Sequence, residues 1–183
     1  DYRIMLCPVE AGDGDGNKYI NIARNRILDG MILLKTRTSD RNVDSLARAG
    51  FPFVLVNHKN FSHTHNFVDS RNIEGAKIAV DYLHARGYRK LGCIAGSIQE
   101  TNGRDRLRGF LEALADNGLS RRDEWLLYGD FDQDTAFRLS ESFFSGDELP
   151  EAVFCADDYM AIGLINKLKE KNIRVPDDIA VMG

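Results

Sequence analysis

Side chains able to bind a small polar molecule follow the apolar, strand-like runs of the sequence. They comprise an Asn–His pair, an arginine reached through a glycine-containing loop, an aromatic residue and several carboxylates: Asn57, His58, Arg106, Phe131, Asp130, Asp132, Asp157 and Asp158. Carboxylates accept hydrogen bonds from paired hydroxyls, an arginine donates two parallel ones, and an aromatic ring packs on the apolar face of a sugar. Together these residue types predict a site for a polyhydroxylated ligand.

Each of these residues also has a simpler structural interpretation. Asp132 and Asp158 stand directly before amphipathic stretches, where a helix N-cap belongs. Arg106 lies about one turn into its helix and is open to either role, whereas Arg108 is expected to be a solvated charge. Phe131 stands between two aspartates and not in an apolar run, which argues against a place in the core.

No motif predicts catalysis or a bound cofactor. The run GDGDG at residues 12–16 lacks the G-x-G-x-x-G spacing, and its aspartates would repel a pyrophosphate. His58, His63 and His65 have only Asp69 as a nearby carboxylate, which is a poor ligand set for a metal. The chain has no G-x-S-x-G elbow, and the carboxylates at the strand ends read as helix caps and not as an acid–base pair. We therefore expect a protein that is not an enzyme and holds neither metal nor cofactor.

The elements that must position these side chains alternate regularly along the chain. The apolar runs predicted as strands are residues 3–7, 31–34, 53–56, 90–95, 125–128, 152–155 and 179–182. The amphipathic stretches predicted as helices are residues 19–27, 43–49, 73–85, 104–117, 135–144 and 160–171. Gly87 and Gly118 stand where C-cap glycines end two of these helices.

This alternation predicts an α/β protein with doubly wound parallel sheets that are covered by helices on both faces. One segment interrupts the rhythm, because residues 57–66 are polar and without period. A loop of that length in a compact domain often marks a boundary. We therefore expect an N-terminal lobe over residues 1–69 and a C-terminal lobe over residues 70–183.

Composition excludes several classes of protein. The 183 residues carry 24 basic and 28 acidic side chains, a formal net charge of −4, with no concentrated basic patch for the phosphates of DNA. No apolar run approaches the ~18 residues that span a bilayer, so no membrane contact is expected. Cys7, Cys93 and Cys155 lie in apolar runs and are expected to be buried strand residues. An odd cysteine count of this kind fits a reducing cytoplasm.

Several motifs resemble the effector domains of LacI/GalR-type transcription regulators. They are ILDGMILL at residues 27–34, NIEGA at 72–76, RGYRKL at 86–91, RLRGF at 106–110, VFCADDYMAIG at 153–163 and VPDDIAVMG at 175–183. The similarity runs nearly from end to end, and the last two motifs in combination are highly specific. It implies a two-lobed fold like that of periplasmic binding proteins, which closes on a small effector.

The resemblance also implies roles for single residues. Arg106 matches the arginine that grips the effector, and Phe131 matches the aromatic residue that stacks on it. Asp157 stands where the family more often has an asparagine that bonds the effector. Asn102 and Glu100 fall on positions that read effector identity in some members.

The chain departs from the family pattern in two places. Asn57 and His58 occupy the place of an acidic–basic pair that usually follows the third strand, and the loop after them is rich in histidine. Arg71 replaces an aspartate expected before Asn72. These departures concern the hinge contacts and the chemistry of the effector.

The expected function is ligand-controlled lobe closure in a transcription regulator. The effector would be a sugar, a sugar phosphate or a purine, and the regulator a cytoplasmic homodimer that binds operator DNA through a helix-turn-helix head not carried by this chain. Family members have further segments before position 1 and after Gly183, so the 183 residues alone are expected to self-associate and not to bind DNA. The alternative is an exported sugar-binding protein of a transporter, which shares the fold.

Overall fold

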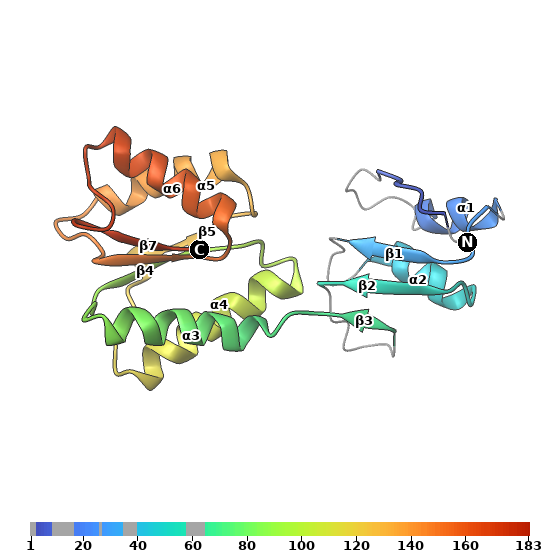
Figure 1. Cartoon of the computed structure of the whole chain (residues 1–183), viewed down its shortest axis with the longest axis horizontal. Helices are drawn as coiled ribbons and strands as arrows, with labels where there is room; N and C mark the ends of the chain where they lie inside the picture. The colour runs from blue at the N-terminus through green and yellow to red at the C-terminus, as the bar shows by residue number, and fades with distance from the viewer. Residues whose placement is uncertain (1–2, 9–16, 26, 35–39, 58–64) are drawn as a thin grey trace. The chain divides into compact units, whose positions relative to one another are not determined.

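The computed structural model describes residues 3–8, 17–25, 27–34, 40–57 and 65–183. The chain divides into two compact units, Asp1–Val68 and Asp69–Gly183 (Figure 1). Each unit contains its own parallel sheet and its own core. The predicted α/β class with parallel sheets is therefore confirmed.

The first unit contains a parallel sheet of three strands. Its elements are α1 (Lys18–Arg24), β1 (Met31–Leu34), α2 (Arg41–Arg48), β2 (Phe53–Val56) and β3 (Phe67–Val68), and the strand order is β1-β2-β3. Helices α1 and α2 pack through Ile20, Val43 and Leu46 on the face that carries Leu33 and Leu55. Both helices therefore cover the same face of the sheet, where their buried residues form one cluster with Leu33 and Leu55.

The other face of this sheet differs from the prediction of helices on both sides. Ile32 and Leu34 alternate with buried Leu33 along β1, and they are 73% and 66% exposed. They pair in register with Val54 and Val56 of β2. Among the described residues, no helix of the first unit packs on this side.

The strand predicted over residues 3–7 is wrong. The described residues 3–8 are irregular, and Ile4 and Leu6 are 91% and 89% exposed. An apolar run becomes a strand only where a sheet edge offers hydrogen bonds, and this run pairs with no described strand. The expectation that Cys7 is buried is wrong for the same reason, whereas Cys93 and Cys155 are buried in their strands as predicted.

The second unit contains four parallel strands in the order β5-β4-β6-β7. Its elements are α3 (Asn72–Ala85), β4 (Leu91–Ala95), α4 (Thr101–Asp116), the 3-10 turn η1 (Asp123–Trp125), β5 (Leu126–Tyr128), α5 (Gln133–Leu139), the 3-10 turn η2 (Ser140–Phe144), β6 (Ala152–Cys155), α6 (Asp158–Glu170) and β7 (Ala180–Met182). The central strands β4 and β6 are fully buried, because helices cover both faces of the sheet.

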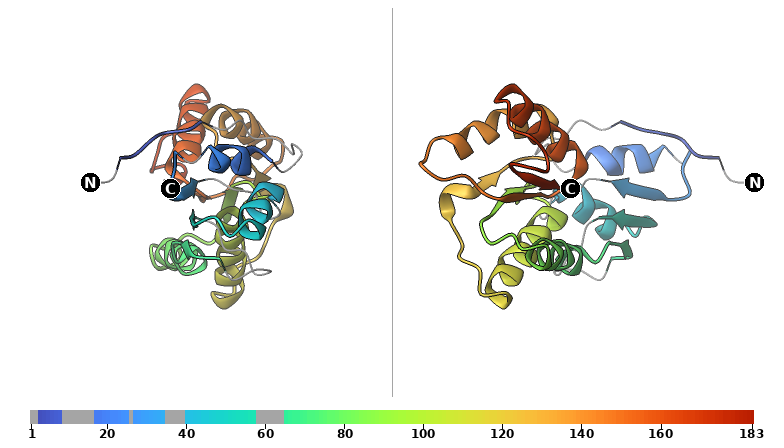
Figure 2. Two further views of the ribbon diagram at one scale, coloured as in Figure 1. Left: turned by 90° about the vertical axis from the view of Figure 1, so that its right-hand side faces the viewer. Right: turned by 60° about the vertical axis from the view of Figure 1, so that its left-hand side comes forward.

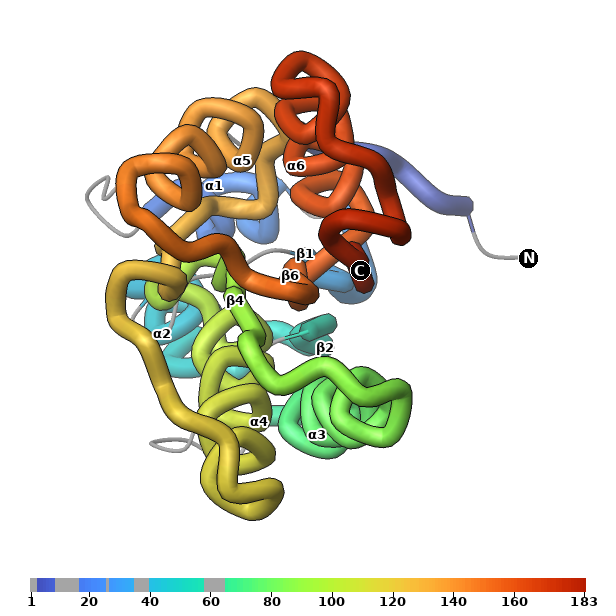
Figure 3. The backbone as a smooth tube through the Cα atoms, turned by 90° about the vertical axis from the view of Figure 1, so that its left-hand side faces the viewer, coloured from blue at the N-terminus to red at the C-terminus, as the bar shows by residue number. Residues whose placement is uncertain are grey.

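The two helical layers of this unit lie on opposite faces of the sheet. Figures 2 and 3 show α3 and α4 on one side of β4 and β6, and α5 and α6 on the other. Phe110 of α4 stacks on Phe154 of β6, with ring centroids 5.9 Å apart, in the first layer. Met160 and Leu164 of α6 and Phe143 of η2 are buried in the second.

Two glycines end helices of the first layer as predicted. Gly87 follows α3 with φ +98°, and Gly118 follows α4 with φ +66°. Glycine adopts this left-handed backbone without the steric penalty of a Cβ atom. The short connections that follow return the chain to the amino ends of β4 and β5.

Candidate functional site

The candidate site lies in the second unit, at the carboxyl ends of its parallel strands. Loops after β4, β5 and β6 meet at this edge, because parallel strands all end there. Arg106 of α4 reaches it: its Nη1 donates to the carbonyl oxygen of Ala156, directly after β6. Its Nε donates to Oδ1 of Asn72 at a distance of 2.8 Å.

Phe131 lies beside Arg106 at the same edge. The Cζ atom of Arg106 is 6.0 Å from the centroid of the Phe131 ring. The ring lies against the backbone of Gly96 after β4, since a Cβ atom built on Gly96 would come within 2.1 Å of it. Gly96 thus allows an aromatic ring from one loop to lie on the backbone of the next.

The backbone of Phe131 is strained. Its φ of +64° lies in the left-handed region, which residues other than glycine and asparagine seldom adopt. Its ring is half-buried and packs on the edge of the second core layer. The ring therefore lies at the border between the core and the candidate site, where part of it stays exposed.

Asp157 is the N-cap of α6. Its Oδ1 accepts from the backbone N–H of Met160 at 2.9 Å, so the N-cap predicted at Asp158 is one residue too far along the chain. Asp158 instead lies in the first turn of α6, with its carboxylate beside Gly183 at the end of β7. A carboxylate has lone pairs on both oxygens, so the capping bond leaves Asp157 able to accept from a ligand.

Asp132 is the N-cap of α5, as predicted. Its Oδ1 accepts from the N–H of Thr135 at 2.8 Å. That hydrogen bond lowers the pKa of Asp132, because it stabilises the charged carboxylate. Asp132 therefore keeps its negative charge at the edge of the candidate site.

The other predicted site residues of this unit lie where α4 begins. Glu100 is the N-cap residue of α4, and Oδ1 of Asn102 accepts from the N–H of Gly103 at 2.9 Å. The loop before them packs tightly on the helix, because a Cβ atom on Gly103 would approach the carbonyl oxygen of Ser97 within 2.2 Å. Both side chains are half-exposed.

The two remaining predicted residues belong to the first unit. Asn57 is exposed and has φ +56°, directly after β2. His58 lies outside the described residues. Their part in an effector site stays a prediction.

The arrangement brings complementary groups for hydroxyl recognition to one sheet edge. Arg106 and Phe131 are in contact, and Asp157 follows the Ala156 carbonyl to which Arg106 is bonded. Sequence reasoning did not find Asn72 as part of the site. Asn72 is 34 positions from its partner Arg106, and no local pattern indicates that separation.

Burial disfavours the reactive form of the two buried thiols of the sheet. Burial raises the pKa of Cys93 and of Cys155 above the usual range of a thiol. A thiolate is the reactive form of cysteine. Both residues are therefore core residues at neutral pH.

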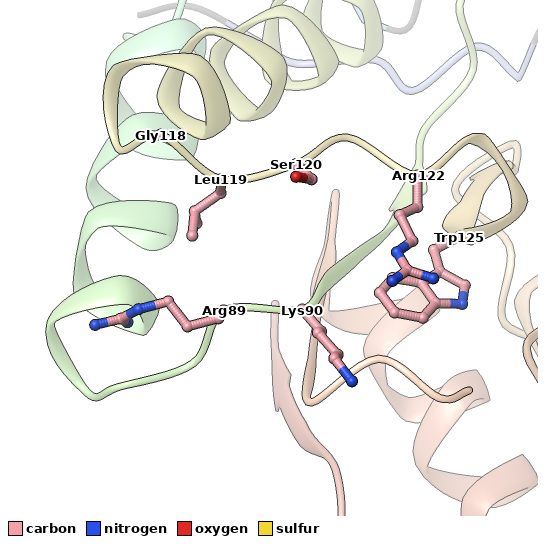
Figure 4. Close-up of a pocket in the computed structure, with 7 residues that line it drawn as sticks. All are labelled: Arg89, Lys90, Gly118, Leu119, Ser120, Arg122 and Trp125. Atoms are coloured by element: carbon pink, nitrogen blue, oxygen red, sulfur yellow. The ribbon is translucent and has the colours of Figure 1, made fainter.

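A pocket lies at the opposite, amino ends of the strands. It has a volume of about 230 Å³ and is lined by Arg89, Lys90, Gly118, Leu119, Ser120, Arg122 and Trp125. Figure 4 shows the Arg122 guanidinium over the Trp125 ring, at 4.7 Å from its centroid. Lys90 and Arg122 both pair with Glu148, at 3.4 and 2.8 Å, so this one carboxylate offsets part of their charge. The groups suited to a polar effector are at the carboxyl edge.

In the part of the chain that the structure describes, no helix is both long and apolar enough to cross a bilayer. The same residues contain no cluster of three or more potential metal ligands.

Comparison with known proteins defines the class. The periplasmic binding protein-like domain family matches residues 80–183, over half of the chain, and the chain belongs to this family. The resemblance to LacI-type regulators is likewise confirmed by curated relatives. The HTH-type transcriptional repressor PurR of Photobacterium profundum is 28% identical over 183 residues, which are 100% of this chain and 55% of the relative. PurR of Vibrio cholerae (strain M66-2) is 30% identical over 184 residues, 100% of this chain and 54% of the relative.

Solved structures agree with the curated relatives. A putative LacI transcriptional regulator from Bacillus cereus subsp. cytotoxis NVH 391-98 has a TM-score of 0.88 and 27% identity, covering 97% of this chain and 63% of that chain. A complex of the transcriptional regulator CelR with cellobiose has a TM-score of 0.84 and 28% identity, and the match covers 92% of this chain and 52% of that chain. The chain thus spans about half the length of the curated relatives it matches.

Proposed function

We propose that this chain binds a small polyhydroxylated effector and thereby controls the DNA binding of a LacI-type regulator. The observation that carries the proposal is the contact of Arg106 with both the Phe131 ring and the Ala156 carbonyl at the carboxyl ends of β4 and β6. A guanidinium with free N–H groups beside an aromatic face suits a sugar ring. Asp157 supplies an acceptor at the same edge.

The charges at this edge favour an uncharged sugar over a sugar phosphate. Asp130, Asp132, Asp157 and Asp158 all follow β5 or β6, and Arg106 already donates two hydrogen bonds to the protein. A phosphate would approach several carboxylates at once. Glu100, Asn102, Asn57 and His58 are proposed as further effector contacts.

The relatives support regulation over transport. The curated relatives named above are transcriptional repressors, and one structural neighbour is a regulator with cellobiose bound. We propose that the whole protein is a cytoplasmic homodimer without catalytic activity. It would bind operator DNA through a helix-turn-helix region of the kind named in the PurR relatives. The effector acts by binding one conformation of the two lobes, more open or more closed, more tightly than the other. The ratio of the two affinities limits how far the effector can shift the equilibrium between these conformations.

The test is a thermal-shift screen of the full-length protein with cellobiose, glucose, galactose, glucose 6-phosphate, adenine and hypoxanthine. A ligand at ~100 times its Kd adds ~2.7 kcal/mol to the free energy of unfolding. An uncharged sugar should raise the melting temperature and change operator affinity in a gel-shift assay. If a purine or glucose 6-phosphate stabilised the protein and no uncharged sugar did, the result would contradict the proposed effector class.

The matched variants are Arg106→Lys and Arg108→Lys, two positions apart on α4. Lysine keeps the charge of Arg106 but loses the planar fork, so calorimetry should show effector affinity lower by at least about 10-fold. Arg108 is 67% exposed and pairs with Glu112, so its variant should bind normally. Equal affinities in the two variants would remove Arg106 from the site.

A further inference from the structure

A buried amide, Asn72, connects Arg106 to the segment that joins the two units. Asn72 is only 6% exposed, and it is the first residue of α3. Its Oδ1 accepts from Nε of Arg106 at 2.8 Å. Its Nδ2 donates to Oδ1 of Asp69 at 3.0 Å and to the carbonyl oxygen of Ser70 at 3.1 Å. Asp69 is the first residue after the unit boundary.

Asp69 and the Ser70 carbonyl together determine which way the Asn72 amide points. A carboxylate accepts hydrogen bonds and cannot donate them at neutral pH, so the NH2 group of Asn72 must be the side that faces Asp69. The carbonyl oxygen of the amide then has to face Arg106. Asp69 is itself held in place, since its Oδ1 also accepts from the N–H of Ser70 at 2.9 Å.

The orientation of the Asn72 amide in turn determines how Arg106 is presented. Arginine has five N–H donors in one plane. Arg106 donates from Nε to Asn72 and from Nη1 to the Ala156 carbonyl, and these two bonds together fix the plane of the guanidinium. Three N–H groups, one on Nη1 and two on Nη2, remain for a ligand.

We propose that Asn72 is a positioning residue for the effector site, which holds the Arg106 guanidinium in its binding orientation and links it to the Asp69–Asn72 junction. The proposal rests on the proposed role of Arg106 as an effector contact. Because coupling between two sites is reciprocal, a ligand that engages Arg106 also changes the stability of the junction between the units. This gives effector binding a direct physical connection to the first residues after the unit boundary.

The test is the exchange of the Arg106 Nε–H proton with solvent, measured by NMR on the full-length protein with 15N-labelled arginine. Arg106→Lys identifies the signal by removing it. In the unaltered protein the Nε–H should be protected, and Asn72→Ala should accelerate its exchange by about 10-fold, the loss expected for one hydrogen bond to a charged group. The paired change Asp69→Asn with Asn72→Asp keeps an oxygen acceptor for the Arg106 Nε–H without placing two carboxylates side by side, so it should restore protection even though the bond to the Ser70 carbonyl is lost.

Two further variants separate positioning from general destabilisation. Asn42→Ala removes an amide of nearly equal burial in the first unit, where Asn42 bonds to Asp40, and should leave the Arg106 signal unchanged. Asp69→Ala leaves Asn72 in place but removes one of the two acceptors that orient its amide, the other being the Ser70 carbonyl, so it should accelerate Arg106 exchange part-way. This variant also tests the proposal if Asn72→Ala does not fold. In Arg106→Lys the backbone amide of Asn72, which donates to Ser70, should exchange faster than in the unaltered protein.

Two results would overturn the proposal. The first is an Arg106 Nε–H that is unprotected in the unaltered protein. The second is an Arg106 Nε–H that is as well protected in Asn72→Ala and in Asp69→Ala as in the unaltered protein. These measurements need no effector. The calorimetric comparison of Arg106→Lys with Arg108→Lys tests the proposed function separately, so failure of one can be told from failure of the other.

Discussion

At the scale of single residues, the Phe131 side chain has two properties that a plain core residue would not combine. Its ring lies on Gly96 next to Arg106, and its backbone has φ +64°. Left-handed backbone at a non-glycine residue costs about 1–3 kcal/mol and persists where the surrounding structure enforces it. Such strain often marks a functional site, which agrees with the proposed stacking of Phe131 on an effector.

Phe131→Ala should weaken effector binding while destabilising the fold less than the ~3–5 kcal/mol of a core Phe→Ala change. Phe131→Gly should lose the same ring but be more stable than Phe131→Ala by about 1 kcal/mol, because glycine adopts this backbone without strain. Urea unfolding and calorimetry on both variants measure the two effects. A large loss of stability with full effector affinity in the folded protein would return Phe131 to the core.

An ion pair with Arg174, directly before the motif VPDDI at residues 175–179, explains one of the two aspartates of this motif. Asp178 accepts from Nε, Nη2 and the backbone N–H of Arg174, at 3.0, 2.8 and 2.8 Å. The side-chain hydrogen bonds from Arg174, followed by the backbone bond, lower the pKa of Asp178 to about 2 from 3.8. This pair closes the turn between α6 and β7.

The stabilisation from Asp178 should depend on pH in a defined window. A carboxyl whose pKa is lower in the folded state stabilises the fold above its unfolded pKa and loses that effect as pH falls through its folded pKa. The contribution should therefore be complete above about pH 4 and disappear towards pH 2. NMR titration should place the Asp178 midpoint near 2, and Arg174→Met should raise it towards 3.8. An unchanged midpoint in Arg174→Met would show that Arg174 is not the cause.

At the scale of elements, the close approach of α3 and α4 depends on Gly109. A Cβ atom on Gly109 would lie 2.3 Å from the carbonyl oxygen of Ile73 and 2.9 Å from Cβ of Ala76. No such neighbour exists for Gly75 of α3, where a Cβ atom would meet nothing within 4 Å. The two helical glycines therefore have opposite roles.

Gly109→Ala should destabilise the protein by about 1–3 kcal/mol, because the added methyl group forces α3 and α4 apart. Gly75→Ala should instead stabilise it by about 0.5–1 kcal/mol, because alanine loses less backbone entropy in a helix. Thermal or urea unfolding of the two single variants provides the comparison. If both changes stabilised the protein, the contact between α3 and α4 would be looser than the structure indicates.

At the scale of the whole molecule, the two units have cores of very different extent. The sheet of the first unit has one small cluster beneath α1 and α2, whereas the four-stranded sheet of the second unit has a buried cluster on each face. Local stability follows the amount of buried apolar contact. The two units are therefore expected to open at different free energies.

Hydrogen exchange at increasing urea should show β1 and β2 losing protection before β4 and β6. Leu46→Ala, at a fully buried position of the first unit, should cost about 2–5 kcal/mol and lower the urea concentration for β1 and β2 alone. Leu164→Ala is the matched change in the second unit, where Leu164 is equally buried. Simultaneous loss of protection in all four strands, in both variants, would show that the chain unfolds as one cooperative unit.

Sequence alone determined most of the elements, their order and the edge of the sheet to which the predicted site residues of the second unit belong. The runs at residues 31–34, 53–56 and 152–155 form strands with the predicted bounds. This succeeds because the period of apolar residues is a local property of the chain, and because parallel strands of an open sheet place their following loops at one edge. Even there, Asp157 and not Asp158 is the cap of α6, since one residue along the chain is within the error of any local pattern.

Tertiary structure alone decided which side chains at that edge touch one another. Three contacts join positions 34 to 50 residues apart: the bond between Asn72 and Arg106, the Phe131 ring on Gly96, and the bond from Arg106 to the Ala156 carbonyl. The same holds for the exposed run at residues 3–8, which has strand composition but pairs with no described strand. Contacts between distant segments depend on how whole elements pack, and the local order of residue types carries little information about that packing.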